Sequence, residues 1–139
     1  MKLERLAGFN HLYRVDKVDE DLQRLFDKDK SCREKYDCWL HSKLLFLDMV
    51  PINVLLLQQP KCFEKLHGVQ DDLYVIRYIS GAANTRMIFV INKLDEDAYV
   101  LLHAFNEKRD SDYARGIKLA LQRSAEVKAM TEEMNNGNE

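Results

Sequence analysis

The sequence has no long apolar run, and this absence excludes a helix that crosses a membrane. The longest apolar stretch, LLFLDMVPINVLLL at 44–57, is interrupted by Asp48, Pro51 and Asn53. It is also shorter than the roughly 20 apolar residues that a spanning helix needs. The N-terminus, MKLERLAGFNHLYRV, has charged residues where a signal peptide needs an unbroken apolar segment. We therefore expect a cytoplasmic protein with no membrane partner.

Cysteine is scarce, and its count of three is odd. An odd count fits a reducing compartment better than a disulfide framework. Two cysteines stand near histidines, in Cys38-Trp-Leu-His41 and in the segment from Cys62 to His67, which raises the alternative of a zinc site. Neither pair has the C-x-x-C form, and the first pair falls within an apolar helical pattern. We interpret the cysteines as small apolar residues and predict neither a metal nor a cofactor.

An excess of positive charge is missing too. The 21 Lys and Arg side chains are outnumbered by 23 Asp and Glu, for a net charge of -2. Because three of the glutamates follow residue 128, the rest of the chain is nearly neutral. A protein that coats nucleic acid by long-range attraction is usually far more basic. Any contact with RNA must therefore come from a small local cluster of cations.

The spacing of apolar residues predicts two helices in the N-terminal half. Val18, Leu22 and Leu25 lie on one helical face, and acidic residues occupy the first turn of that segment. A second helix is predicted around residues 36–47, where apolar residues recur every three or four positions until Pro51 stops them. A short strand at 11–15 precedes this helical pair.

From Leu73 onward the apolar period changes to two. LYVIRYI at 73–79, TRMIFVIN at 85–92 and AYVLLHAF at 98–105, joined by turn-rich segments, are typical of an antiparallel meander. A final helix with an apolar stripe follows, and the polar segment 129–139 is predicted to be disordered. The sequence thus predicts one α+β domain over residues 1–128, with an N-terminal helical pair packed on one face of a meander of three to four strands and a C-terminal helix.

Two arginines lie within the predicted meander. Alternation places Arg77 on the same strand face as aliphatic Val75, where a guanidinium either snorkels or pairs with a carboxylate unless it has a functional role. Arg86 stands near the start of the next strand. Whether it lies beside Arg77 depends on the register, because a slip of one residue moves a side chain to the other face. The sequence leaves this register open.

Four segments in order resemble the motifs of the RelE/HigB toxin superfamily, in particular its phage-derived branch. They are KLHG at 65–68, LYVIR at 73–77, RMIF at 86–89 and VLLHAFNEK at 100–108. The resemblance covers roughly residues 61–127, and over 10–60 only the helical pair agrees. It implies a RelE-like fold and the toxin of a type II toxin-antitoxin pair, usually an endoribonuclease that cuts messenger RNA, often on the ribosome. The expected partners are messenger RNA and a helix-turn-helix antitoxin.

The chemistry of RNA cleavage selects candidate site residues. Attack by the 2′-hydroxyl needs a base, cations around the phosphate and an acid for the departing 5′-oxygen. Guanidinium groups suit the phosphate, and a histidine, with its reference pKa of about 6.5, suits either proton-transfer role. The resemblance adds a lysine in the family's basic loop and a nearby tyrosine. The predicted catalytic residues are Arg77, Arg86, His103, Lys108 and Tyr113, with Lys65 and Arg109 as further RNA contacts and no metal ligand.

The segment after Phe105 departs from the family pattern. Where the branch has a lysine-rich loop, this chain has NEKRDSD at 106–112. Three interpretations stay open: Glu107 serves as the base, RNA binding is weak, or the chain is an inactive relative that acts as a binding module. A toxin that inhibits a protein target is a further alternative. Asp110 and Asp112 are interpreted as residues that cap the final helix.

Overall fold

The computed structural model describes residues 1–27, 29–69, 71–80, 83–92 and 98–136. These residues form an α+β structure with four helices and a six-stranded mixed sheet. The elements in chain order are β1 (Leu3–Arg5), β2 (Leu12–Val15), α1 (Lys17–Leu25), α2 (Lys30–Met49), α3 (Ile52–Gln58), β3 (Phe63–Lys65), β4 (Leu73–Ser80), β5 (Ala83–Asn92), β6 (Ala98–Asn106) and α4 (Asp110–Asn136).

The sheet has the strand order β1-β2-β6-β5-β4-β3. Strands β4, β5 and β6 form the antiparallel centre, whereas β2 pairs with β6 in parallel. The predicted architecture, a meander of three to four strands, is therefore wrong. Strands β1 and β3 have three residues each, too few to show an alternation of apolar and polar residues in the sequence. The parallel pairing of β2 with β6 could not be predicted either, because it depends on no pattern of neighbouring residues.

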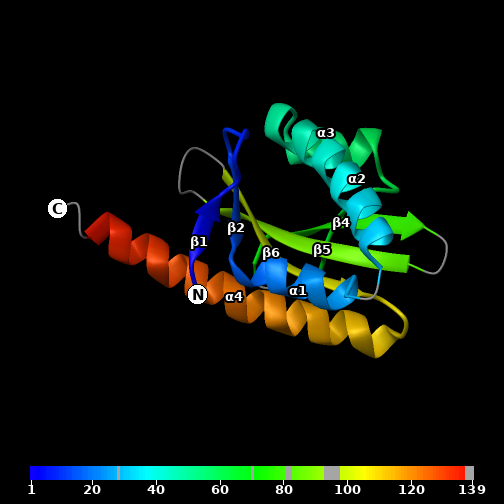
Figure 1. Ribbon diagram of the computed structural model, residues 1–139. Helices are drawn as coiled ribbons and strands as arrows, with labels where there is room; N and C mark the ends of the chain where they lie inside the picture. The colour runs from blue at the N-terminus through cyan, green and yellow to red at the C-terminus, as the bar shows by residue number, and fades with distance from the viewer. Residues whose placement is uncertain (28, 70, 81–82, 93–97, 137–139) are drawn as a thin grey trace.

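The helices cover both faces of the sheet (Figure 1), so the prediction of helices on one face is also wrong. Helices α1 and α4 pack against β6 on one face. On the other face, Tyr78 of β4 packs against Tyr36 of α2 with ring centroids 5.1 Å apart, and the Ile52 amide of α3 donates to the Tyr99 hydroxyl of β6 at 3.1 Å. The physical reason is visible in β6, whose residues 98–105 are all buried. A strand buried on both sides needs two covering layers.

Local signals explain where the helices of the second layer begin and end. The Asp29 carboxylate accepts a hydrogen bond from the Cys32 amide at 3.1 Å and caps the start of α2. Helix α2 ends at Met49, just before Pro51, as the sequence predicts. Pro51 then precedes the unpredicted helix α3, and proline is well tolerated at a helix start because its fixed φ suits the first turn.

A β-bulge in β6 decides which layer each of its side chains faces. Leu102 is an extra residue in the pairing with β5, so the alternation of side chains switches there. Before the bulge, Leu101 lines a cavity with leucines of α2. After it, His103 contacts residues of α1 and α4, and Phe105 lies directly against Gly116 of α4. Unbroken alternation would have left all three β6 side chains on the α2 face.

Helix α4 continues to Asn136, past residue 128 where a disordered tail was expected. The last residues of that tail, 137–139, and the predicted turns at 81–82 and 93–97 lie outside the described residues. Over the described part of the chain, none of the helices combines the length and apolarity needed to cross a bilayer.

Candidate active site

The register of the central strands brings the two candidate arginines together. Arg77 of β4 is the direct partner of Arg86 of β5, and Arg86 is the partner of Phe105 in β6. Partners in register share a face of the sheet, and Phe105 lies against α4. Both arginines therefore face the α4 layer, side by side. The sequence left this register open, and the structure settles it in favour of a pair.

Each guanidinium has a glutamate beside it, but the two pairs differ in strength. Arg86 is buried, and its Nε and Nη2 lie 3.0 and 2.9 Å from Oε2 of Glu107. Arg77 is half-buried, and its Nη1 lies 3.8 Å from Oε2 of Glu64, beyond hydrogen-bond distance. Arg86 thus binds and orients Glu107, whereas the Arg77 guanidinium donates no hydrogen bond to Glu64.

Three buried donor groups at this place have no hydrogen-bond partner within the described structure. They are Nε of Arg77, Nη1 of Arg86 and the hydroxyl of Tyr113. Buried donors are nearly always satisfied in proteins, so an unsatisfied set calls for an explanation such as a bound acceptor. We name Glu64, Arg77, Arg86, Glu107 and Tyr113 the arginine-tyrosine cluster. Because these three donors are themselves buried, an anion with several oxygens reaches them only where neighbouring side chains move.

The state of Tyr113 follows from its surroundings. Burial raises the pKa of its hydroxyl to about 12, with a smaller increase from Glu64 and Glu107 and an opposing effect of Arg86 and Arg77. The four charged members of the cluster are therefore close enough to act on this hydroxyl. At neutral pH the group is protonated and serves as a donor, not as a base.

The two loop cations lie at the edge of the cluster, whereas Lys65 lies elsewhere. Lys108 and Arg109 are exposed directly after Glu107, and their backbone amides each donate to Asp112 Oδ2 at 3.0 Å. The Asp112 carboxylate thus fixes the loop that precedes α4. Lys65 pairs with Tyr74, and its Nζ lies 5.9 Å from the Tyr74 ring. Because Lys65 directly follows Glu64 in β3 and neighbouring side chains of a strand alternate between faces, Lys65 and Tyr74 lie on the sheet face opposite Glu64.

His103 is separated from the arginines and belongs to a buried triad. Its Nδ1 lies 2.8 Å from Oδ2 of Asp21 in α1, and Arg123 of α4 donates from Nη1 to the same oxygen at 2.6 Å. Arg123 Nη1 also donates to the Leu102 carbonyl at 2.9 Å. Burial raises the pKa of Asp21, but the hydrogen bonds from His103 and Arg123 outweigh this effect and hold the pKa below 3.8. Asp21 is therefore ionised and holds α1, β6 and α4 together.

Sequence reasoning missed Asp21, Arg123 and Glu64. The first two had a signal, because Asp21 falls on the apolar face of α1, three residues after Val18, and Arg123 falls three residues after Ala120 of the apolar stripe in α4. A charged residue on an apolar helix face needs a buried partner. Their pairing spans 102 residues, so the sequence offered no means to match them.

Comparisons of the chain with family models, with curated proteins and with solved structures find no match. The resemblance of the four segments to toxin motifs thus stays a prediction.

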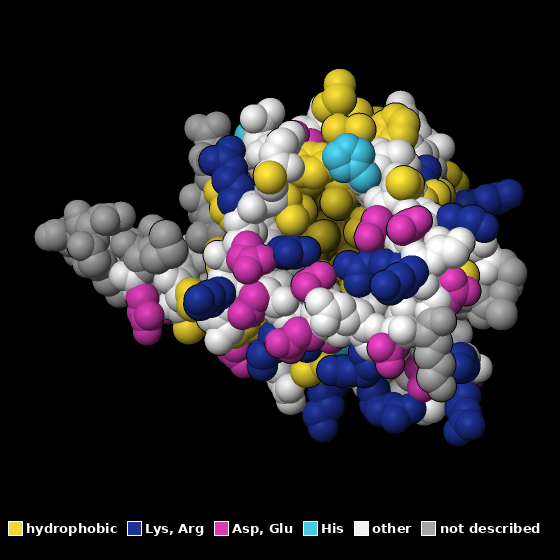
Figure 2. Space-filling view, viewed as in Figure 1, with side chains coloured by type: hydrophobic (Ala, Val, Ile, Leu, Met, Phe, Trp, Pro, Cys, Tyr) yellow, Lys and Arg dark blue, Asp and Glu magenta, His cyan; other side chains and the backbone are white. Residues whose placement is uncertain are grey.

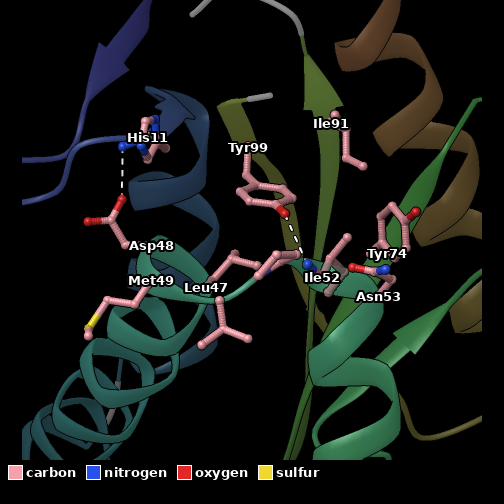
Figure 3. A pocket seen from close by; sticks show the side chains of 11 residues that line it. His11, Leu47, Asp48, Met49, Ile52, Asn53, Tyr74, Ile91 and Tyr99 are labelled. Carbon is pink, nitrogen blue, oxygen red and sulfur yellow. Dashed lines mark hydrogen bonds between the residues drawn. The ribbon is translucent and has the colours of Figure 1, made fainter. Parts of the chain in front are cut away.

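Two cavities lie away from the cluster. One, of about 510 Å³, lies where α2 meets α3. The only charged side chain in its lining is Asp48, whose carboxylate accepts hydrogen bonds from the backbone amides of Asn10 and His11. Figure 3 shows the hydrogen bond from the Ile52 amide to the Tyr99 hydroxyl in this cavity. The second, of about 210 Å³, is lined by apolar residues of α1, α2, β5 and β6 and by Arg14, Arg33 and Asp37. Both of these arginines are held in ion pairs with carboxylates. Figure 2 shows an apolar hollow between the β1-β2 hairpin and α2, bordered by charged side chains. Neither cavity gathers free cations.

The alternative zinc site has no support in the geometry. Cys38 is exposed and Cys62 half-buried, and both are free thiols. Among the described residues, no three side chains of His, Cys, Asp or Glu converge as metal ligands would.

Proposed function

We propose that the chain is the toxin of a type II toxin-antitoxin pair and cleaves messenger RNA, without a metal, at the arginine-tyrosine cluster. The observation that carries the proposal is the register pairing of Arg77 with Arg86, which places three unpartnered donors beside a carboxylate. The order of the four sequence segments supports the same class of activity. Where Arg77 and Arg86 donate to the phosphate, they stabilise the charge that grows in the transition state.

Glu107 takes the role of the base in this proposal. Its carboxylate, oriented by Arg86, accepts the proton of the RNA 2′-hydroxyl as the 2′-oxygen forms a bond to phosphorus. The bond from phosphorus to the 5′-oxygen breaks, and Tyr113 donates its proton to that leaving oxygen. The products are a 2′,3′-cyclic phosphate and a free 5′-hydroxyl, and transfer of the proton from Glu107 to Tyr113 restores the site. His103 has no part in this step, because Phe105 separates it from the cluster.

Lys108 and Arg109 act as RNA contacts at the rim of the site. Both side chains are exposed, and they follow Glu107 directly in the chain. Their cations attract the phosphates that flank the cleaved one, which compensates locally for a nearly neutral protein. Lys65, on the opposite face of the sheet, is left out of the proposed site.

The test is cleavage of messenger RNA by the purified chain, with ribosomes supplied and with a metal chelator present. We expect fragments that end in a 2′,3′-cyclic phosphate, and growth arrest when the chain is expressed without its antitoxin. Co-expression of a helix-turn-helix protein from the neighbouring gene should restore growth. Intact messenger RNA and normal growth, with abundant folded protein, would overturn the proposal.

A second candidate function is the inhibition of a protein target, which needs no catalytic group. Apolar side chains exposed on α2 and α3, namely Phe46, Met49 and Leu57, favour it, because large apolar surfaces often mark interaction sites. The two functions separate in one variant. If Arg77→Ala stops RNA cleavage but leaves growth arrest intact, the toxic action is binding to a protein.

A further inference from the structure

Strand β1 leaves backbone hydrogen-bonding groups open at the edge of the sheet. Among the described residues, its only neighbour in the strand order is β2, and Figure 1 shows it as the outermost strand on that side. The Asp16 amide donates to the Lys2 carbonyl at 2.9 Å. Since the residues that bond to β2 alternate along an antiparallel strand, the amides and carbonyls of Leu3 and Arg5 point away from β2. An edge of this kind can pair with a strand of another chain.

A groove lies directly beside this edge. It has a volume of about 530 Å³ and lies between β1 and the C-terminal part of α4. Met1, Leu3 and Met130 give it apolar walls, and its charged members are Lys2, at the edge of the sheet, and Glu133 of α4. Figure 1 shows α4 continuing past β1. A chain that paired with β1 would therefore also contact α4 and cover apolar side chains.

The side chains along β1 alternate between the two faces of the sheet. Glu4 pairs with Arg14 at 3.1 Å, and Arg14 lines a cavity together with leucines of α2. By alternation Lys2 and Glu4 lie on the α2 side, whereas Leu3 lies on the α4 side. The Glu4 carboxylate uses Oε2 for Arg14, which leaves Oε1 for a further cation. The exposed Lys2 side chain forms no ion pair within the described structure.

The charges of β1 select one way of pairing it with a second copy of the chain. The outward-facing groups of both copies must meet, so an antiparallel pair of β1 strands is centred on residue 2, 3, 4 or 5. Centres at 2, 4 and 5 set Lys2, Glu4 or Arg5 opposite its own copy, and like charges directly opposite each other destabilise a strand pair. The centre at Leu3 instead sets Lys2 opposite the partner's Glu4, twice by symmetry.

We propose that the chain forms a symmetric dimer through β1, in which antiparallel pairing centred on Leu3 joins two sheets into one. The two Leu3 side chains meet on the α4 side, beside the apolar groove, and the two pairs of Lys2 with Glu4 lie on the α2 side. The dimer does not depend on the proposed function. Arg77 and Arg86 lie on β4 and β5, and two strands, β2 and β6, separate them from β1.

The test is the mass of the full chain in solution, measured by analytical ultracentrifugation over a range of concentrations. The wild type should form a dimer. Lys2→Glu sets two carboxylates opposite each other and Glu4→Lys sets two ammonium groups opposite each other, so each variant alone should bind its own copy at least about tenfold more weakly. Lys61→Glu, the same charge reversal on an exposed residue before β3 at the other edge of the sheet, should dimerise like the wild type.

An equimolar mixture of the two charge variants tests the register itself. When Lys2→Glu meets Glu4→Lys, every facing pair again has one acid and one base, so the mixture should form dimers that neither variant forms alone. Misfolding of a variant could not produce this recovery. Leu3→Pro removes an outward-facing amide but no bond to β2, so it should weaken the dimer while the circular dichroism of the chain stays unchanged.

Each outcome decides the inference. A wild type that stays monomeric up to its limit of solubility would overturn it. A dimer that Lys2→Glu weakens no more than Lys61→Glu does, or a mixture of the charge variants that stays monomeric, would overturn it as well. A dimer that is lost in both charge variants and restored in their mixture would support it, whether or not the chain cleaves RNA.

Discussion

Removal of Asp21 should destabilise the protein more than removal of any other carboxylate in an ion pair described above. Asp21 is 2% exposed and accepts from His103, Arg123 and the Ala104 amide. Asp21→Ala leaves the buried Arg123 guanidinium without a counter-charge. A buried pair broken in this way typically costs about 3–5 kcal/mol. Urea denaturation of wild type and variant, followed by circular dichroism, measures the difference in the free energy of unfolding.

A matched control and a rescue make the test specific. Asp37 is also paired with an arginine, but its side chain is 49% exposed, so Asp37→Ala should cost less than about 1 kcal/mol. Arg123→Met in the Asp21→Ala background should recover part of the loss, because the uncompensated charge is removed. A loss for Asp21→Ala no larger than that for Asp37→Ala would refute the account of the triad.

Two further predictions concern packing and pH. Gly116→Ala should lower the free energy of unfolding by about 1–2 kcal/mol, although alanine has the better helix propensity, because the new Cβ would lie 2.5 Å from the Phe105 ring. In a Phe105→Leu background, the same substitution should stabilise the protein. If Gly116→Ala stabilised the wild-type protein, the close packing of Gly116 against Phe105 would be contradicted. The pKa of Asp21 in the folded state lies below 3.8, so its stabilisation is complete above that pH and is lost as the pH falls through the lower value. Acid titration of stability should therefore be steeper for wild type than for Asp21→Asn below about pH 4, and parallel curves would contradict this.

The strongest local patterns of the sequence predicted the elements well. The period-two segments at 73–79, 85–92 and 98–105 correspond to β4, β5 and β6, and the apolar spacing around Val18 and Leu40 corresponds to α1 and α2. These signals are local, because the apolar face of a helix or strand is formed by residues that are close together in the sequence. The architecture was not predictable in the same way, since the parallel pairing of β2 with β6 joins segments far apart in the chain.

The composition of the candidate site depended on two features that a single sequence does not specify. The β4-β5 register decides whether Arg77 and Arg86 meet, and a slip of one residue would part them. The bulge at Leu102 turns His103 toward Asp21 and Arg123, away from the α2 layer. Hence the predicted set of residues divides into a cluster around Tyr113 and a separate triad around His103.

The central claim is that the arginine-tyrosine cluster binds the phosphate that is cleaved, and a comparison of two arginine variants tests it most directly. Arg77 and Arg14 are matched, with side chains 29% and 31% exposed and each beside a glutamate whose side chain is 44% exposed. Arg14, however, lies on β2 at the other end of the sheet. Cleavage of messenger RNA, with ribosomes supplied, should fall on the order of a hundredfold for Arg77→Ala and stay near wild type for Arg14→Ala, while both variants remain folded. Equal cleavage by wild type and Arg77→Ala would contradict the claim.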